Sequence, residues 1–114
     1  MPTLKNKTLQ IQYVKTIGIV NTASTGRGFA SPVDCIINED GHLLVLNRWT
    51  PFIRVSVYDQ NEGHLYDIGS HGDGDGQFRL PTSLALDNQK RVYIADEYHH
   101  RINVFESSGV FLNS

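Results

Sequence analysis

Five histidines are the residues of this 114-residue chain best suited to metal binding or acid–base chemistry. They are His42, His64, His71, His99 and His100. No two of them have the HxH or HxxxH spacing of zinc ligands, and adjacent residues on a strand point to opposite faces of a sheet. The sequence also contains no phosphate-binding loop and no recognisable Ser-His-Asp set. We therefore predict no catalytic residue, no cofactor and no metal site within a single chain.

The segment His71-Gly72-Asp73-Gly74-Asp75-Gly76 has a faint likeness to a calcium-binding loop. It lacks the third oxygen ligand and the closing Glu at the required spacing. Glycine also supplies positive φ angles in ordinary connections. We interpret this segment as a connecting loop.

Cys35 is the only cysteine, so neither an intrachain disulfide nor a thiolate metal cluster can form within one chain. It lies in the apolar run 33–37. We expect a buried structural thiol rather than a reactive one.

The segments that contain these candidate residues have the sequence pattern of short β-strands. Within residues 69–111 a Gly-rich loop ends at Gln77-Phe78, and apolar runs follow, separated by turn residues at 87–88 and 107–109. Four short runs divided by turns predict an antiparallel meander. No segment keeps a 3.6-residue apolar stripe over a dozen residues, so no helix is expected.

This stretch resembles the NHL repeat, a family of β-propeller blades. The matching residues are Gly76-Gln77-Phe78, Pro81, Val92-Tyr93-Ile94-Ala95-Asp96, His100-Arg101-Ile102-Asn103-Val104-Phe105 and Gly109. The resemblance implies an all-β propeller fold. It leaves the function open, because NHL propellers serve as protein-binding, RNA-binding and enzymatic scaffolds.

An earlier part of the chain repeats the same unit. Residues 28–32 match residues 77–81 at a spacing of 49, and residues 54–59 match residues 101–106 at a spacing of 47. The two additional residues fall near 50–53, where a loop is expected to accommodate them. We predict one partial propeller domain over residues 1–114. It has nine strands: an N-terminal strand over 8–18, four in blade one over 28–69 and four in blade two over 76–114.

Asp96 and Arg101 are the polar signature of the resembled repeat. We expect Asp96 either to accept hydrogen bonds from turn amides or to pair with Arg101 across the hairpin. The first repeat has Asn47 where the second has Asp96, and it keeps Arg54. The neutral Asn47 favours a structural role over a catalytic one.

Aromatic residues occur between the second and third strands of each repeat. Trp49 and Phe52 lie there in the first repeat, and Tyr98 is followed by His99 and His100 in the second. Exposed aromatics at a propeller rim are anchors for a binding partner, and packing over the blade core is the alternative. Tyr98 and the histidines after it suit stacking on single-stranded RNA, but the net charge of −2 makes nucleic acid an unfavoured partner.

Two blades are too few for a closed propeller, because a blade takes roughly 40–50 residues and a propeller about 4–8 blades. Each blade face must pack on a neighbour or expose apolar side chains. We expect copies of the chain to complete a six-bladed NHL-type propeller head to tail, with a trimer favoured and the N-terminal strand completing an adjacent blade. The alternatives are a propeller fragment and a non-ring dimer.

We interpret the chain as a non-enzymatic scaffold that binds a protein or a small ligand. The first alternative is an enzyme resembling the peptide-amidating lyases or lactonases, with a metal held by repeated histidines at the ring axis. The second is RNA binding. Because no signal-peptide core and no membrane-length apolar run is found, we expect a soluble cytoplasmic protein with no membrane partner.

Overall fold

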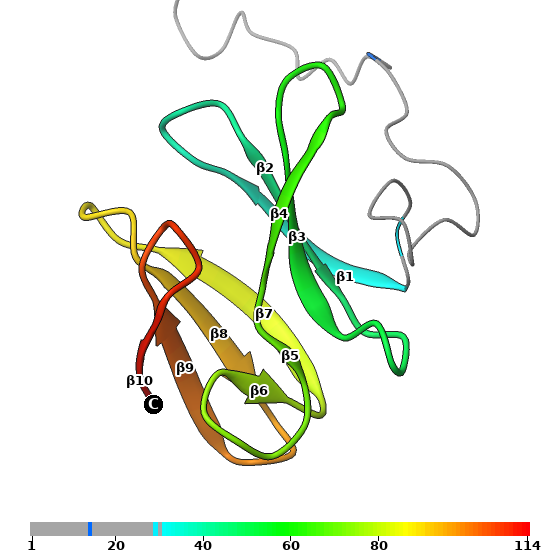
Figure 1. Ribbon diagram of the computed structural model, residues 1–114, viewed down its shortest axis with the longest axis vertical. Helices are drawn as coiled ribbons and strands as arrows, with labels where there is room; N and C mark the ends of the chain where they lie inside the picture. Colours follow the sequence, from blue (N-terminus) through cyan, green and yellow to red (C-terminus); the bar gives the residue numbers. More distant parts are fainter. Residues whose placement is uncertain (1–13, 15–28, 30) are drawn as a thin grey trace, which may run out of the picture.

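The computed structural model describes Val14, Phe29 and residues 31–114. These residues form two four-stranded antiparallel sheets whose strand order follows the sequence (Figure 1). Sheet one contains β1 (Pro32–Ile37), β2 (Leu43–Asn47), β3 (Arg54–Tyr58) and β4 (His64–Ile68). Sheet two contains β7 (Pro81–Leu86), β8 (Val92–Asp96), β9 (Arg101–Phe105) and β10 (Phe111–Asn113). The prediction of an all-β fold without helices is confirmed for this part of the chain, which accordingly has no helix able to cross a membrane.

A short parallel sheet connects the two larger ones, and the sequence pattern did not predict it. It pairs β5 (Ser70–His71) with β6 (Gln77–Phe78). The chain enters it at Gly69, whose φ is 74°. A Cβ atom at Gly69 would lie 2.3 Å from the Phe78 ring, so both the conformation and the contact require glycine.

The register of the strands divides each sheet into two faces, which we call the A face and the B face. In sheet one, Leu44 lies between Ile36 and Val57 on the A face, and Val45 lies between Cys35 and Ser56 on the B face. In sheet two, the repeat places Ser83, Ala85, Tyr93, Ala95, Ile102 and Val104 on the A face. The B face of sheet two carries Leu84, Leu86, Val92, Ile94, Asn103 and Phe105.

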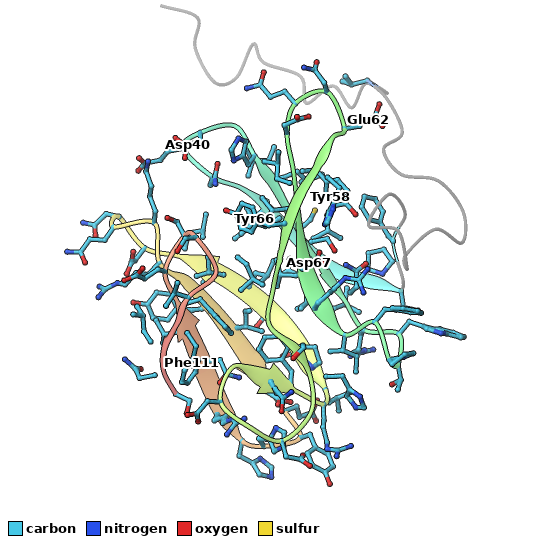
Figure 2. All side chains as sticks on the ribbon, viewed as in Figure 1. Asp40, Tyr58, Glu62, Tyr66, Asp67 and Phe111 are labelled. Atoms are coloured by element: carbon cyan, nitrogen blue, oxygen red, sulfur yellow. The ribbon has the colours of Figure 1, made fainter. Side chains whose placement is uncertain are left out.

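The hydrophobic core lies where the A face of sheet one meets the B face of sheet two. Its members include Leu44, Leu46, Val55 and Val57 from sheet one, and Phe78, Leu84, Val92, Ile94 and Phe105 from the second repeat. The Asp34 carboxylate of β1 crosses this interface and accepts a hydrogen bond of 2.8 Å from the Leu84 amide of β7. The Tyr66 hydroxyl crosses it at another point, donating to the Ser107 carbonyl at 2.6 Å. Tyr66 and Asp67 project from opposite sides of β4, as strand alternation requires (Figure 2).

Ten apolar residues of the two repeats, which the sequence pattern predicts to form the faces of the blades, are buried or half-buried. Those that are buried are Val45, Val57, Leu84, Val92, Ile94 and Phe105, and those that are half-buried are Ile36, Leu43, Leu86 and Val104. The prediction of a buried Cys35 is wrong, because this residue is exposed. It lies on the B face of β1, a strand at the edge of sheet one, where Ile37 is also 69% exposed.

The length difference between the two repeats lies in a turn, as predicted. The β2–β3 connection spans residues 48–53, whereas the β8–β9 connection spans 97–100. The predicted N-terminal strand, 8–18, lies outside the described residues except for Val14, which is exposed and not in a strand. The division into blades over 28–69 and 76–114 stays a prediction, within which the sheets occupy 32–68 and 81–113.

Candidate functional site

Three loops lie at the corresponding ends of the two sheets, two of them at the bottom of Figure 1 below sheet two and one at the right, at the lower end of sheet one. They are residues 48–53, 72–76 and 97–100, and we call these ends together the rim. Trp49 and Tyr98 are each 60% exposed there, and His100 is exposed as well. Phe52 and His99 are half-buried. The structure therefore places all five predicted rim residues in the β2–β3 and β8–β9 loops, with the two largest aromatic side chains facing solvent.

The part of the rim on sheet one is organised by Asn47 and Arg54. Asn47 is 2% exposed, and its Nδ2 donates to the Val45 carbonyl at 3.2 Å and to Ser56 Oγ at 3.3 Å. The Arg54 guanidinium lies 5.3 Å from the centroid of the Phe52 ring, within the range of a cation–π contact. Asn47 thus connects β2 to β3 beside the loop that presents Trp49, and Arg54 contacts Phe52 within that loop.

Asp96 has the corresponding position on sheet two, and it is 1% exposed. Its Oδ1 accepts a hydrogen bond of 2.9 Å from the Leu80 amide, and its Oδ2 accepts one of 3.2 Å from the Arg79 amide. Burial by itself would raise the pKa of Asp96, but the Leu80 amide, His99 and the Arg79 amide together hold this pKa below its ordinary value. Asp96 therefore accepts hydrogen bonds from backbone amides at the entry to β7, which is the first of its two predicted structural roles.

The other predicted role, a pairing of Asp96 with Arg101 across the hairpin, is not found, because the described residues show no ion pair between these two side chains. Its Nη2 donates to the Gly74 carbonyl at 2.9 Å and to the Gln77 carbonyl at 3.1 Å. Arg101 thus fastens the β5–β6 loop to β9. Asp96 and Arg101 therefore form hydrogen bonds to two neighbouring backbone segments rather than to each other.

His99 joins a buried carboxylate to an exposed one. Its Nδ1 lies 2.5 Å from Asp96 Oδ2, and its Nε2 lies 2.8 Å from Asp73 Oδ1. A histidine donates from both ring nitrogens only as the imidazolium. The hydrogen bonds to Asp96 and then to Asp73 raise the pKa of His99 above its ordinary value of 6.5.

Asp73 is also paired with Arg79 in a two-point contact. Arg79 Nη2 lies 2.7 Å from Asp73 Oδ2, and Arg79 Nε contacts Oδ1 of the same carboxylate. These bonds from Arg79 and then the bond from His99 hold the pKa of Asp73 far below its usual range. The Arg79 guanidinium lies 5.6 Å from the centroid of the Tyr98 ring, which itself meets the His99 ring edge to face at 5.0 Å.

We call Asp73, Arg79, Asp96 and His99 the rim network. Two carboxylates face two cations, so the network is close to neutral, and every ring nitrogen of His99 is occupied by a carboxylate. His99 consequently has no free lone pair with which to act as a base. Among the described residues no three His, Cys, Asp or Glu side chains are grouped to hold a metal ion. The arrangement is suited to fixing the orientation of the exposed Tyr98.

Sequence reasoning did not place Asp73 and Arg79 in this network. Asp73 lies 26 residues before His99 in the β5–β6 loop, and Arg79 lies 20 residues before His99 in the connection between β6 and β7. The Gly-Asp-Gly pattern was the only available signal, and it indicated a loop without indicating its partners.

The fold defines a class of protein, namely one built from repeated four-stranded antiparallel sheets that pack face to face. Comparison with known proteins is consistent with this class, since residues 78–105 match the family model of the NHL repeat. NHL repeat-containing protein 3 from Homo sapiens is 28% identical over 102 residues, and the same protein from Mus musculus is 26% identical over 102 residues. Each match covers 84% of this chain and 28% of the relative.

A third relative, protein lin-41 from Caenorhabditis elegans, is 31% identical over 52 residues, which is 46% of this chain and 4% of that protein. The chain thus spans 28% or less of the length of these relatives. The chain carries an NHL repeat, and its resemblance to NHL-repeat proteins is confirmed.

Proposed function

We propose that this chain is a non-enzymatic interaction scaffold of the NHL type, which assembles with copies of itself into a propeller ring and binds a protein or a small ligand at its rim. The observation that supports assembly is apolar exposure at the β1 edge of sheet one and on the A face of sheet two. Ile37 is 69% exposed on the B face of sheet one, and Ile102 is 53% exposed on the A face of sheet two.

Exposed isoleucines on these faces favour further packing. Burying such a side chain contributes roughly 1.5–3 kcal/mol. Where the two sheets of the chain already pack on each other, the apolar side chains Leu46, Val55 and Ile94 are completely buried. A head-to-tail interface uses two different surfaces on each copy and closes when the rotation between copies permits it. Six blades, the usual number in the family that the chain resembles, would need three copies.

Support for ligand binding comes from the rim. Trp49 and Tyr98 are large aromatic residues with 60% exposure, and such residues dominate the binding energy of many interfaces. The loop of Trp49 is contacted by Arg54 through the Phe52 ring, and the loop of Tyr98 is bonded to the buried Asp96 through His99. A rigid loop loses little conformational entropy on binding, which favours affinity.

The assembly is tested by light scattering coupled to size exclusion. We expect a mass three times the 12.8 kDa of one chain at high protein concentration. A mass of one chain at every concentration would refute the ring.

The rim is tested by selecting peptides from a displayed random library against the purified chain. Trp49 is the only tryptophan, so its fluorescence reports directly on peptides bound at the rim. We expect Tyr98→Ala to weaken binding of the selected peptides about tenfold or more. The matched control is Leu65→Ala, which removes a 42% exposed apolar side chain from β4 and should leave binding unchanged. Equal binding by both variants would contradict a rim site.

A further inference from the structure

A single histidine joins the two rim loops of sheet two. His99 belongs to the β8–β9 loop, and its Nε2 lies 2.8 Å from Oδ1 of Asp73 in the β5–β6 loop. Among the described residues, this is the only hydrogen bond or ion pair between residues 72–76 and residues 97–100. An imidazole donates from both of its nitrogens only when it is charged, so the contact between the two loops depends on one proton.

The two carboxylates that face His99 differ in their access to water. Asp96 is 1% exposed and already accepts two backbone amides, whereas the Asp73 side chain is 61% exposed. Water can take the place of His99 beside Asp73 but not beside Asp96, and a buried carboxylate that loses a donor costs free energy. When the imidazole loses one proton, the remaining proton therefore stays on Nδ1, and the Nε2 lone pair then faces and repels the Asp73 carboxylate.

The charges around His99 set the direction of this switch. The hydrogen bonds to Asp96 and then to Asp73 raise the pKa of His99, and its desolvation and the charge of Arg101 on β9 oppose them. Arg79, in the connection between β6 and β7, is bonded to the same Asp73 carboxylate. Because the net result is a raised pKa, the bond from Nε2 to Asp73 is present below the folded-state pKa and is lost as the pH rises through it.

The same histidine supports Tyr98, the exposed aromatic residue of the β8–β9 loop. The Tyr98 and His99 rings meet edge to face, with centroids 5.0 Å apart. The Arg79 guanidinium lies 5.6 Å from the Tyr98 centroid and is joined to Asp73 by two contacts. A shift of Asp73 away from His99 takes Arg79 with it, so Tyr98 then loses part of its support.

We propose that His99 is a proton-operated latch: the protonated ring holds the β5–β6 loop against the β8–β9 loop and fixes Tyr98, and loss of the proton separates the loops. The bond from Arg101 Nη2 to the Gly74 carbonyl does not titrate near neutral pH, so the released loop stays on sheet two. A freer Tyr98 loses more conformational entropy on binding, so a ligand bound there is held more tightly at low pH. This inference rests on the proposed ligand binding at the rim and adds its regulation.

Nuclear magnetic resonance of the full chain tests the latch without any ligand. The His99 ring and the backbone carbonyl carbons of Gly72 and Gly74 are followed between about pH 5 and pH 9, where histidines titrate. We expect the two carbons to shift with the same midpoint as the ring. Asp73→Asn should lower the midpoint of the ring, because it removes the charge beside Nε2. His99→Gln should abolish the transition of the two carbons. The matched control, His64→Gln, should keep it, although His64 Nε2 also lies 2.9 Å from a carboxylate, that of Asp67.

Two results would overturn the latch. If the carbons of Gly72 and Gly74 keep their shifts while the His99 ring titrates, loss of the proton does not move the loop. If the ring has the same midpoint in Asp73→Asn as in the unsubstituted chain, Asp73 does not hold the imidazolium. Circular dichroism shows whether each variant is folded. Asp73→Asn changes an exposed residue, so it decides the question even if His99→Gln unfolds.

The effect on binding is measured with a peptide selected against the rim. The peptide contains no histidine or cysteine and has a blocked amino terminus, so that it does not titrate near neutral pH itself. Fluorescence anisotropy of the dye-labelled peptide should give a dissociation constant about two- to tenfold larger above the His99 midpoint than below it. His99→Gln should bind equally on both sides of that midpoint, and His64→Gln should behave as the unsubstituted chain does.

The binding results separate failure of the latch from failure of the rim site. A dissociation constant that stays constant across the midpoint in the unsubstituted chain would overturn the regulation and leave binding at the rim intact. If no selected peptide depends on Tyr98 for binding, the proposed rim site fails and its regulation fails with it. The carbon shifts decide separately whether His99 holds the two loops together.

Discussion

Removing the Asp96 carboxylate should destabilise the second sheet strongly. In Asp96→Ala the amides of Arg79 and Leu80 lose their acceptor at the entry to β7. A buried donor without a partner costs about 1–3 kcal/mol. Because these two amides are only part-buried, water restores some of the loss. We therefore expect a loss of about 2–4 kcal/mol in the free energy of unfolding, a large fraction of the roughly 5–15 kcal/mol typical of a domain.

Asp96→Asn should cost less than Asp96→Ala. The amide side chain keeps one carbonyl oxygen, which can accept one of the two backbone amides. The first repeat functions with Asn47 at this position, buried to 2% exposure. We expect the order of stability to be Asp, then Asn, then Ala.

Urea unfolding followed by circular dichroism measures these differences by linear extrapolation. The experiment is best performed at one protein concentration near pH 6, where His99 is protonated in the folded chain. The matched control is Asp75→Ala, an exposed carboxylate in the loop of the rim network, which should change stability by no more than about 0.5 kcal/mol. The reasoning is refuted if Asp96→Ala loses less than about 1 kcal/mol, or if the Asn variant is the less stable of the two.

Three further predictions concern pH, the core and the contact between sheets. Because carboxylates raise the pKa of His99, the stability that it contributes is complete below its unfolded-state value of 6.5 and is lost as the pH rises through the folded-state pKa. In His99→Gln the stability should depend less on pH in this range. If the urea midpoint of His99→Gln falls above pH 6.5 as steeply as that of the unsubstituted chain, the assignment is contradicted. Ile94→Asp should unfold the chain as judged by circular dichroism, because Ile94 is 0% exposed, whereas Ile102→Asp on the same sheet should keep its β signal. Tyr66→Phe removes the hydroxyl bonded to the Ser107 carbonyl and should cost about 0.5–1.5 kcal/mol in urea unfolding, and no measurable loss would show that this bond does not hold the sheets together.

The strands of this protein were predictable because their signals are local. Alternating apolar residues and turn residues mark β7 to β10, and the 49-residue period carries the same reading to β1 to β4. The additional residues of the first repeat were correctly assigned to the β2–β3 turn. The burial of Ile94 and the exposure of Trp49 at a rim follow from the same periodicity.

The candidate site was only partly predictable, because its contacts join distant segments. Asp96 and His99 are three residues apart, so a turn could bring them together, but Asp73 reaches His99 only because the loop after β5 folds back over the end of β8. The predicted pairing of Asp96 with Arg101 was not realised, although the two residues are opposite each other on β8 and β9. Asp96 instead accepts a hydrogen bond from the Leu80 amide, and Arg101 donates one to the Gln77 carbonyl.

The sequence by itself determined the all-β repeat, the positions of its turns and its resemblance to the NHL repeat, because alternation, turn chemistry and repetition are all properties of short segments. Tertiary structure alone decided which face of each strand is covered. Cys35 and Leu84 occupy equivalent positions in apolar runs, yet Leu84 is 8% exposed and Cys35 is exposed. The physical reason is that the B face of sheet two meets the other sheet of the chain, whereas β1 turns the same face outward at the edge of sheet one.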